Sequence, residues 1–502
     1  MKTGKILAFY MGFVLITTTF TMAVLPVTIG QIGGDESMFE LITGTTGEGN
    51  YSEETKDWEK GDFVGFRLSK DAWFYIIYGN QNNRSHITMA SVQLRYLGGA
   101  TIQDKDGNDI IDQIGIPVVT VYGQSLLGLF EFQDEGYTPK NMFGEPTNET
   151  KGAHNNLWDF KRTANGLEEW DDSFVYTEPV VKAAMLNTSW NRSEIIESQN
   201  ENGSHSYDFS LSAEDLEYGD DKGKIWDPDF QNDETNDTSI EKVEFTFHID
   251  ISVDDVSING IPWYDIRIDG RGDDLQVISS RGAGSRDFDG KAVNAQYKYD
   301  HYIEGWDFKD LEKDSKLMLE SVSMFGTFVP DIVHEWFDKQ FVEGIEGALG
   351  FAEYEYDNAG DVVDAVIGEE STAPDRAHLV QKESISFNDN WRRVGEQTWV
   401  SDVEVDNETT DTFYQIHAGQ NKTGRSKDDN GHFKALVLLG GYIYPAGSVI
   451  YHDPGFSATA ILIDIDSKLL LFPAGIIGLQ FLIAVVAVSG AGVIGIRKRR
   501  KT

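Results

Sequence analysis

The most informative absence in this 502-residue chain is cysteine, of which there is none. Disulfide bonds, thiolate metal sites and a cysteine nucleophile are therefore excluded. Aromatic residues make up 12% of the chain and hydrophobic residues 40%, which is enough to bury substantial cores. The chain is thus expected to fold without disulfides, and its length suits one elaborated domain or two or three ordinary ones.

Basic residues are scarce between the two ends of the chain. Lys2 and Lys5 precede the first apolar run, and the five basic residues 497–501 follow the last one. Without these seven, 35 basic and 83 acidic residues remain, a net charge of −48. A body with this charge repels nucleic acid and anionic lipid and attracts cations or basic partners, so no nucleic-acid partner is expected.

Complete catalytic signatures are also missing. His334-Glu335 is not followed by the second histidine of a zinc-protease motif. The segment Gly123–Gly128 departs by one residue from the nucleophile elbow of α/β-hydrolases. No catalytic residue is assigned, and the favoured interpretation is a protein without enzymatic activity.

The N-terminus has the pattern of a secretory signal peptide. A short basic region precedes an unbroken apolar run at residues 6–16, and small residues permit cleavage after Ala23. The alternative is an uncleaved anchor that continues to Ile29. The threonines at 17–19 dilute the apolar run and favour a cleaved signal peptide at residues 1–23.

The C-terminus predicts a single transmembrane helix. Residues 469–496 contain no charged side chain, and these 28 residues are enough to cross a hydrocarbon core of ~30 Å. The basic tail at 497–502 then stops transfer and marks the cytoplasmic side. The sequence therefore predicts a single-pass protein of the cell membrane, with its body outside the cell and its C-terminus in the cytoplasm.

Asparagine glycosylation signals are frequent in the predicted external body. The nine Asn-x-Ser/Thr acceptors, more than chance placement predicts, are Asn50, Asn83, Asn148, Asn187, Asn191, Asn202, Asn236, Asn407 and Asn421. All of them lie between the two apolar ends. Glycosylation on exposed loops is therefore expected, and it supports the same orientation in the membrane.

Strand patterns dominate the body. Residues Val243–Val253 alternate without fault between apolar and polar side chains, as in a strand with one solvated face, which also places His248 among surface residues. Asn259-Gly260 predicts a tight hairpin. Further strands are predicted at Trp73–Tyr78, Val92–Leu97, Val118–Tyr122, Tyr297–Tyr302, Lys316–Val322, Thr398–Val405, Ala435–Leu439 and Thr459–Ile465. The predicted fold is mainly β, a β-sandwich-type ectodomain in two β-rich parts, 31–239 and 240–466.

One helix is expected within this body. Apolar residues recur every three or four positions over residues 331–349, after Pro330 and Asp331. The acidic residues between them would repel anionic lipid. The pattern therefore favours a helix that packs on the core over one that lies on the membrane surface.

A stretch of aromatic and polar residues at 297–307 is the strongest candidate for ligand binding. Aromatic rings could stack on sugars while neighbouring polar groups bind their hydroxyls. The candidate residues are Tyr299, Asp300, His301, Glu304, Trp306 and Asp307. The alternative, a packed strand whose polar groups are satisfied internally, is favoured. His452-Asp453-Pro454 is a similar, weaker candidate.

Acidic clusters make calcium the candidate cation. The oxygen-bearing candidates are Asp104, Asp106, Asn108, Asp109, Asp227, Asp229 and Asp233. The segment 104–109 groups four of them around Gly107 but lacks the rest of a twelve-residue calcium loop. An ordinary turn and a solvated loop are the favoured alternatives for the two clusters.

In overall layout the chain resembles archaeal single-pass surface glycoproteins. The resemblance rests on the signal peptide, the acidic cysteine-free body, the acceptors, the apolar helix and the basic tail. It implies a membrane-anchored cell-surface glycoprotein, an envelope-layer or adhesion component with possible self-association. An anchored extracellular solute- or glycan-binding protein is the second hypothesis, and an extracellular hydrolase is the third.

Overall fold

The computed structural model describes a chain built from strands. The described residues are 40–45, 62–69, 72–81, 84–133, 158–160, 174–176, 180–199, 204–218, 239–269, 276–309, 315–330, 384–389, 392–398, 402–425 and 431–463. The mainly β fold is confirmed within them. They contain no helix of the length and hydropathy needed to cross a membrane. The predicted signal peptide at 1–23, the helix at 331–349, the membrane helix at 469–496 and the tail at 497–502 lie outside them.

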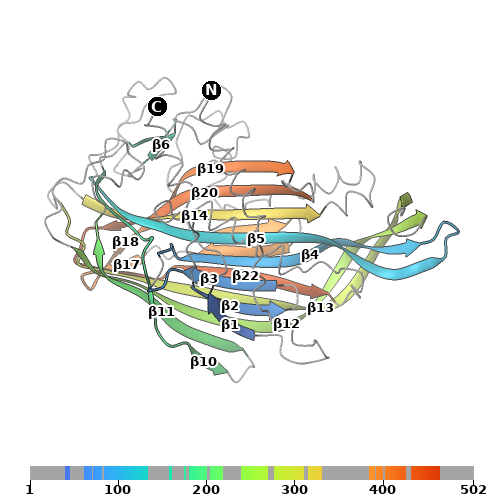
Figure 1. The fold of residues 1–502 in the computed structure, drawn as a ribbon, viewed down its shortest axis with the longest axis horizontal. Coiled ribbons are helices and arrows are strands. Elements are labelled where there is room, and N and C mark those ends of the chain that lie inside the picture. The colour runs from blue at the N-terminus through green and yellow to red at the C-terminus, as the bar shows by residue number, and fades with distance from the viewer. Residues whose placement is uncertain are drawn as a thin grey trace.

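Hydrogen bonds link 20 strands into one continuous sheet, which folds into two layers that we call sheet A and sheet B (Figure 1). Sheet A runs in the order β1–β2–β3–β4–β5–β14–β20–β19, and β8 pairs with β5. Its strands are β1 (Glu40–Thr45), β2 (Asp62–Ser69), β3 (Ala72–Tyr78), β4 (Thr88–Gln103), β5 (Asp109–Gln133), β8 (Val180–Met185), β14 (Ser315–Pro330), β19 (Phe413–Arg425) and β20 (Gly431–Pro445). All these pairings are antiparallel.

Sheet B is centred on two long strands, β12 (Ser239–Asp269) and β13 (Gln276–Glu304). On one side β12 pairs with β11, which pairs with β9 and β10. On the other side β13 pairs with β21 and β22. Strand β21 then pairs with β17, which pairs with β18, and β22 pairs with β16, which pairs with β15. The remaining strands are β9 (Asn191–Arg192), β10 (Ile196–Gln199), β11 (His205–Glu217), β15 (Ser384–Asp389), β16 (Arg392–Thr398), β17 (Asp402–Val405), β18 (Glu408–Asp411), β21 (Val449–His452) and β22 (Gly455–Ile463). A separate hairpin joins β6 (Trp158–Phe160) and β7 (Phe174–Tyr176).

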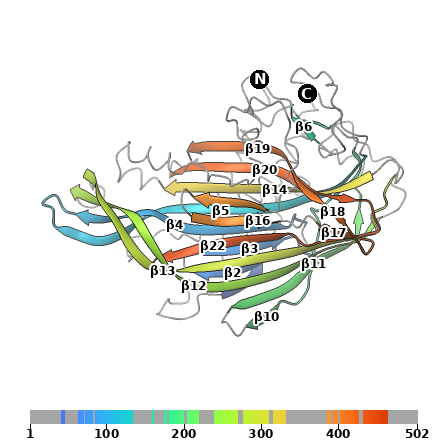
Figure 2. The same ribbon diagram turned by 180° about the vertical axis from the view of Figure 1, so that it is seen from behind.

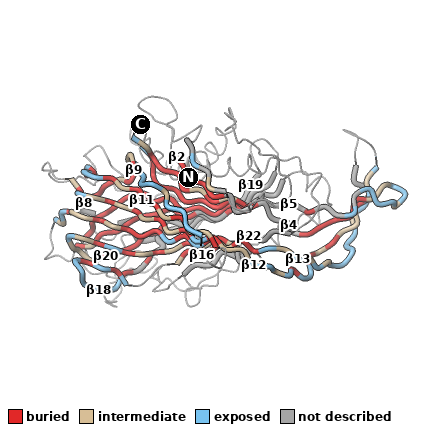
Figure 3. Tube along the Cα trace, turned by 90° about the horizontal axis from the view of Figure 1, so that it is seen from below, coloured by how far each residue is buried: buried red, intermediate tan, exposed pale blue. Residues whose placement is uncertain are grey.

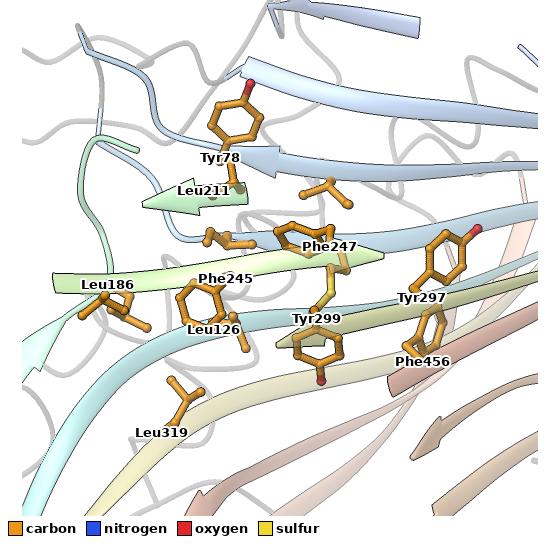
Figure 4. Packing of buried hydrophobic residues seen from close by; sticks show 14 of the residues in the cluster. Tyr78, Leu126, Leu186, Leu211, Phe245, Phe247, Tyr297, Tyr299, Leu319 and Phe456 are labelled. Carbon is orange, nitrogen blue, oxygen red and sulfur yellow. The ribbon is translucent and has the colours of Figure 1, made fainter. Parts of the chain in front are cut away.

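The two sheets pack face to face around one hydrophobic core. The alternation predicted for β12 is observed: Phe245 and Phe247 are fully buried (Figure 4), and His248, between Phe247 and Ile249, is partly exposed. Aromatic rings cross between the sheets. The rings of Phe74 and Tyr297 stack with centroids 3.5 Å apart, and those of Tyr122 and Phe456 with centroids 4.3 Å apart. This packing makes the body a β-sandwich, in which each sheet contains strands from both halves of the chain.

An arm extends from one end of the sandwich (Figures 1 and 2). Beyond the sheets, the β4–β5 and β12–β13 hairpins continue together, because β4 pairs in parallel with β12 through Gly99–Gln103 and Trp263–Arg267. This is the pairing that joins the two sheets by hydrogen bonds. We define the arm as residues 99–115 and 261–286, a ribbon in the order β5–β4–β12–β13.

Asn259-Gly260 does not form the predicted hairpin. Strand β12 continues through this pair, and the register passes from Ile258 opposite Phe288 to Ile261 opposite Arg286. The two residues therefore form a β-bulge, in which Gly260 adopts a φ of 77°. Its backbone N–H donates a hydrogen bond of 2.8 Å to the carboxylate of Asp287. The glycine supplies the left-handed conformation of a turn, but the long partner strand keeps the chain extended.

The other predicted strands lie within observed ones, with two differences. The strand predicted at Thr459–Ile465 is described as far as Ile463, where β22 ends, and residues 464 and 465 lie outside the described residues. The segment predicted as a strand at Thr398–Val405 is divided between β16, which ends at Thr398, and β17, which begins at Asp402. The two strands have different partners, since β16 pairs with β22 and β17 pairs with β21. The chain thus changes its partner strand from β22 at Thr398 to β21 at β17.

Candidate functional site

The predicted ligand-binding residues occupy three different environments. Because side chains alternate along β13, Tyr299 and His301 point into the sandwich, and Asp300 and Glu304 lie on the outer face of sheet B. Trp306 and Asp307 follow the end of the strand. The structure therefore does not bring the six residues together on one surface.

Tyr299 and His301 belong to a buried polar network between the sheets. The Tyr299 hydroxyl donates to the side-chain oxygen of Gln124 at 2.8 Å and lies 3.0 Å from the hydroxyl of Tyr442. His301 Nδ1 lies 2.8 Å from the Tyr444 hydroxyl, which lies 3.2 Å from His452 Nδ1. Burial raises the pKa of Tyr299 and lowers the pKa of His301. Tyr299 and His301 are therefore neutral and hydrogen-bonded inside the sandwich, as the packed-strand alternative expects, but His301 Nε2 has no hydrogen-bond partner among the described residues.

Trp306 and Asp307 connect the end of β13 to sheet A. Trp306 is buried, and its indole N–H donates to the carboxylate of Glu131 at 3.1 Å. The carboxylate of Asp307 lies 3.3 Å from the Lys182 ammonium, and its backbone N–H donates to the Tyr218 hydroxyl at 2.9 Å. The Trp306 ring is therefore a packing element and is not open to stack on a sugar.

Asp300 is the member of the predicted set that lies in a candidate site. It is on the outer face of sheet B, where its side chain retains 10% of its exposure. His248, on the neighbouring strand β12, is placed between two carboxylates: Nδ1 is 2.6 Å from Asp208 and Nε2 is 3.6 Å from Asp300. Strands β11, β12 and β13 thus line up an acid, an imidazole and a second acid across the sheet.

Lys298, Tyr451 and Asp453 complete this group, which we call the outer cluster with Asp208, His248 and Asp300. The Lys298 ammonium lies 3.6 Å from Asp300 and 2.7 Å from Asp453. The Tyr451 hydroxyl donates to Asp300. Partial burial acts to lower the pKa of Lys298, but the hydrogen bond to Asp453 and the charge of Asp300 outweigh it and raise that pKa. Partial burial and the bond to Asp300 raise the pKa of Tyr451.

The chemistry of the outer cluster suits binding. Since Lys298 stays charged and Tyr451 stays protonated near neutral pH, neither supplies a nucleophile. Three carboxylates against one ammonium give the cluster a negative charge whether His248 is neutral or protonated. The Tyr451 ring is 37% exposed beside these groups. An apolar ring next to charged hydrogen-bonding groups is an arrangement that suits a polyhydroxylated ligand.

Sequence reasoning found only part of this cluster. Asp208, His248 and Asp300 are separated by at least 40 residues from one to the next, so no local motif unites them. The alternation of β12 placed His248 on a polar face, and His452-Asp453-Pro454 was a weaker candidate. What was missing was the register, which sets Asp208 opposite His248, and His248 opposite Lys298.

The calcium candidates at 104–109 form a turn at the tip of the arm. The Asp104 carboxylate accepts hydrogen bonds from the backbone N–H groups of Asp106, at 2.9 Å, and Asn108, at 2.8 Å. It also accepts one from the Asn108 side chain, and these bonds lower the pKa of Asp104. Within the described residues no cluster of three or more acidic or histidine side chains could hold a metal. Asp227, Asp229 and Asp233 lie outside them, so calcium binding stays a prediction.

Three glycosylation acceptors have described side chains, and all three are exposed. Asn187 lies in the connection from β8 to β9, Asn191 is the first residue of β9, and Asn407 lies in the turn from β17 to β18 with a φ of 68°. The other six acceptors have no described side chain. The strands β8, β9 and β18 lie toward the end of the sandwich opposite the arm (Figure 3).

Comparison with family models and with curated proteins gives no match. No family model matches the chain, and no curated protein matches it. The function is therefore inferred from the chain's own residues and geometry.

Proposed function

We propose that this chain is a single-pass, glycosylated cell-surface protein whose β-sandwich body is a non-enzymatic envelope-layer or adhesion component. In this proposal the body lies outside the cell, residues 469–496 cross the membrane, and 497–502 lie in the cytoplasm. The proposal combines the charge pattern of the two ends with a body that reaches a packed core without disulfides.

The observation that carries the proposal is the exposure of Asn187, Asn191 and Asn407. A glycan can be attached only where the asparagine reaches solvent, because the sugar is bulky and polar. Two of these residues lie in connections between strands, where an attached glycan does not disturb the pairing of either sheet. The outer cluster adds support, since its lysine and tyrosine are held in forms that bind and do not attack a substrate.

Protease treatment of intact cells tests the orientation. An enzyme that cannot cross the membrane should release most of the body and leave a C-terminal fragment in the membrane. Complete protection of the body, with cleavage only after the cells are lysed, would contradict the proposal.

Glycan analysis of the intact protein tests the second line of support. Asn187→Gln and Asn407→Gln should each remove the mass of one glycan. Asn259→Gln is a matched control, because Asn259 is exposed but is not followed by an acceptor sequence. Bare asparagines at all nine acceptors of the wild-type protein would remove this support.

A second candidate function is glycan or solute binding at the outer cluster. It is favoured by one observation, the exposed ring of Tyr451 beside Asp300, Lys298 and His248. Titration of the full-length chain in detergent with neutral oligosaccharides tests it by calorimetry. Binding should be lost in Asp300→Asn and Tyr451→Ala and kept in Asp254→Asn, an exposed aspartate elsewhere on β12. Equal affinity in all three variants would exclude this site.

A further inference from the structure

The arm has two strand edges without partners among the described residues. On one side, β5 pairs with β14 only from Val119 onward, which leaves 109–118 paired to β4 alone. On the other side, β13 pairs with β22 only from Gly290 onward, which leaves 276–289 paired to β12 alone. Free strand edges are sites where another chain can add to a sheet.

Each free edge carries an isoleucine exposed at a bulge. Ile110 is skipped where the register passes from Ile111 opposite Ile102 to Asp109 opposite Gln103. Ile278 is skipped in the same way between Val277 and Ser279. The two isoleucines are 55% and 51% exposed and are among four large hydrophobic residues exposed in the described chain. A bulge that only protects an edge has no need to turn an apolar side chain to solvent, so these two are suited to contact a partner.

The two edges carry opposite charges. The distal part of β5, 109–115, contains Asp109 and Asp112 and no basic residue. The distal part of β13, 276–286, contains Arg281 and Arg286 and no acidic residue. Asp287 and Asp289 follow nearer the sandwich, and Arg281 lies 3.2 Å from the carboxylate of Asp265 on β12, so the basic part of this edge is its outer stretch alone. Two β5 edges or two β13 edges would repel each other, whereas a β5 edge attracts a β13 edge.

The strand directions permit the same contact to repeat. Strand β4 is antiparallel to β5 and parallel to β12, and β12 is antiparallel to β13, so β5 and β13 run in the same direction. A second copy related by translation therefore brings its β5 beside β13 of the first in a parallel pairing. Contacts between two different surfaces of the same protein generate open rows or rings.

The arm also lacks glycosylation acceptors. Neither 99–115 nor 261–286 contains an Asn-x-Ser/Thr sequence. The strands next to the acceptors with described side chains, β8, β9 and β18, lie toward the opposite end of the sandwich (Figure 3). The arm itself therefore offers no asparagine to which a sugar could be attached beside either edge.

We propose that the arm joins copies of this chain head to tail, with the β5 edge of one arm against the β13 edge of the next. This inference rests on the proposed envelope-layer function and assigns it an assembly surface. The arm is stiff enough for the role because it has its own small core. The Trp263 ring lies over Gly99, where any Cβ would come within 2.2 Å of it, and its N–H donates to Thr101 at 3.0 Å.

Charge reversal tests the proposal in the full-length glycosylated chain, purified in detergent and followed by sedimentation velocity. Arg281→Asp leaves one acidic side chain together with Arg286 on the β13 edge, and Asp112→Arg leaves one basic side chain together with Asp109 on the β5 edge, so each change cancels the net charge of one edge. Each variant should therefore associate at least about tenfold more weakly than wild type. An equimolar mixture of the two variants should associate again, because the unchanged β5 edge of one variant meets the unchanged β13 edge of the other. Asp402→Arg, an exposed reversal on β17, should behave as wild type.

Two results would overturn the proposal. The first is a wild-type chain that stays monomeric at every concentration that can be reached in detergent, and the second is single variants that associate as well as wild type. Arg281 is 80% exposed and Asp112 is exposed, so neither change should prevent folding, which melting curves verify. Surface proteolysis of cells that carry the same variants separates this proposal from the previous one. We expect the arm variants to be cleaved at the cell surface like wild type, although they do not assemble. A wild-type chain that never reaches the surface would contradict the proposed function.

Discussion

The four strands of the arm also run through the sandwich, yet the two regions are stabilised differently. In the sandwich, β12 and β13 bury one face under sheet A, and aromatic pairs such as Phe74 and Tyr297 fill the space between the sheets. In the arm, the two hairpins have only each other, and the buried side chains gather around Trp263. The strands of the sandwich are thus stabilised by packing against a second sheet. The strands of the arm lack that packing, and two of their edges are accessible.

Removal of a core ring from the sandwich should have the largest effect. Phe247 is fully buried and stacks on Phe209 with ring centroids 5.1 Å apart. Phe247→Ala should lower the free energy of unfolding by roughly 3–5 kcal/mol, because it removes buried surface and leaves a cavity. Urea unfolding of the full-length chain measures this. A loss below 1 kcal/mol would mean that the two sheets do not depend on each other as described.

The matching change in the arm should act locally. Trp263→Ala removes the ring that packs on Gly99 and lies under the Arg286 guanidinium, 3.9 Å from it. The cost of opening the arm should fall by roughly 3 kcal/mol, while the main unfolding transition stays in place. Hydrogen exchange should show faster exchange at 99–115 and 261–286 alone. Faster exchange throughout the sandwich would show that the arm and the sandwich are one cooperative unit.

Acid should loosen the sandwich before the arm, which contains no histidine. His86 is buried, with Nδ1 3.1 Å from the Leu126 carbonyl oxygen, and burial lowers the pKa of His86 to about 4. Below the unfolded pKa of ~6.5, the unfolded chain binds a proton that the folded chain does not, so stability present above pH 6.5 is lost as the pH falls toward 4. The loss from this residue should reach ~3 kcal/mol.

The control is His86→Gln, whose free energy of unfolding should fall less than that of wild type between pH 7 and pH 4. Buried His301, whose pKa is also lowered by burial, adds to the acid sensitivity of both proteins. Identical losses in variant and wild type would show that His86 is protonated in the folded state.

One buried group should weaken the sandwich at neutral pH. Glu320 on β14 lies between Gly128 and Gly441 of the neighbouring strands, and its carboxylate oxygens have no hydrogen-bond partner among the described residues. Burial raises its pKa well above the ordinary value. A raised folded pKa contributes stability below an unfolded pKa of ~4.5 that is lost as the pH rises.

Glu320→Met should therefore raise the free energy of unfolding at pH 7 by roughly 1–3 kcal/mol, since it removes a buried polar group without a partner. The gain should shrink as the pH falls toward 4.5. Glu320→Gln keeps the polar atoms without the charge and should show a smaller gain. A destabilised methionine variant would indicate that Glu320 has a partner in the folded chain.

Calcium binding should give the smallest change in the free energy of unfolding. If calcium binds at 104–109, it would stabilise the tip of the arm. Sites with a dissociation constant of ~10⁻⁴–10⁻³ M at about 1 mM calcium contribute roughly 0.4–1.4 kcal/mol. Melting curves of the full-length chain in calcium, magnesium and sodium at equal ionic strength measure this. A gain that Asp104→Asn abolishes would assign the site to the arm. A calcium curve that matches sodium would leave Asp104 as a turn residue alone, with its carboxylate bound to backbone N–H groups.

The sequence predicted the elements better than their associations. The alternation at Val243–Val253 was sufficient for β12, because each apolar residue there faces the core and each polar one faces solvent. The hairpin predicted at Asn259-Gly260 was wrong, because a glycine in the left-handed conformation suits a β-bulge as well as a hairpin turn. The candidate set at 299–307 mixed inward and outward residues. Its composition is unusual because neighbouring residues of this segment belong to three different features, which are the buried polar network, the outer cluster and the end of β13.

What the sequence determined by itself is the β-rich character of the body, because alternation at a period of two is a local property of each strand. It also determined the charge imbalance and the absence of disulfides. Only the tertiary structure decided which strands face each other, that Asp208, His248 and Asp300 meet, and that two hairpins join as an arm. The physical reason is that register and sheet pairing depend on contacts between distant residues, which no local pattern encodes.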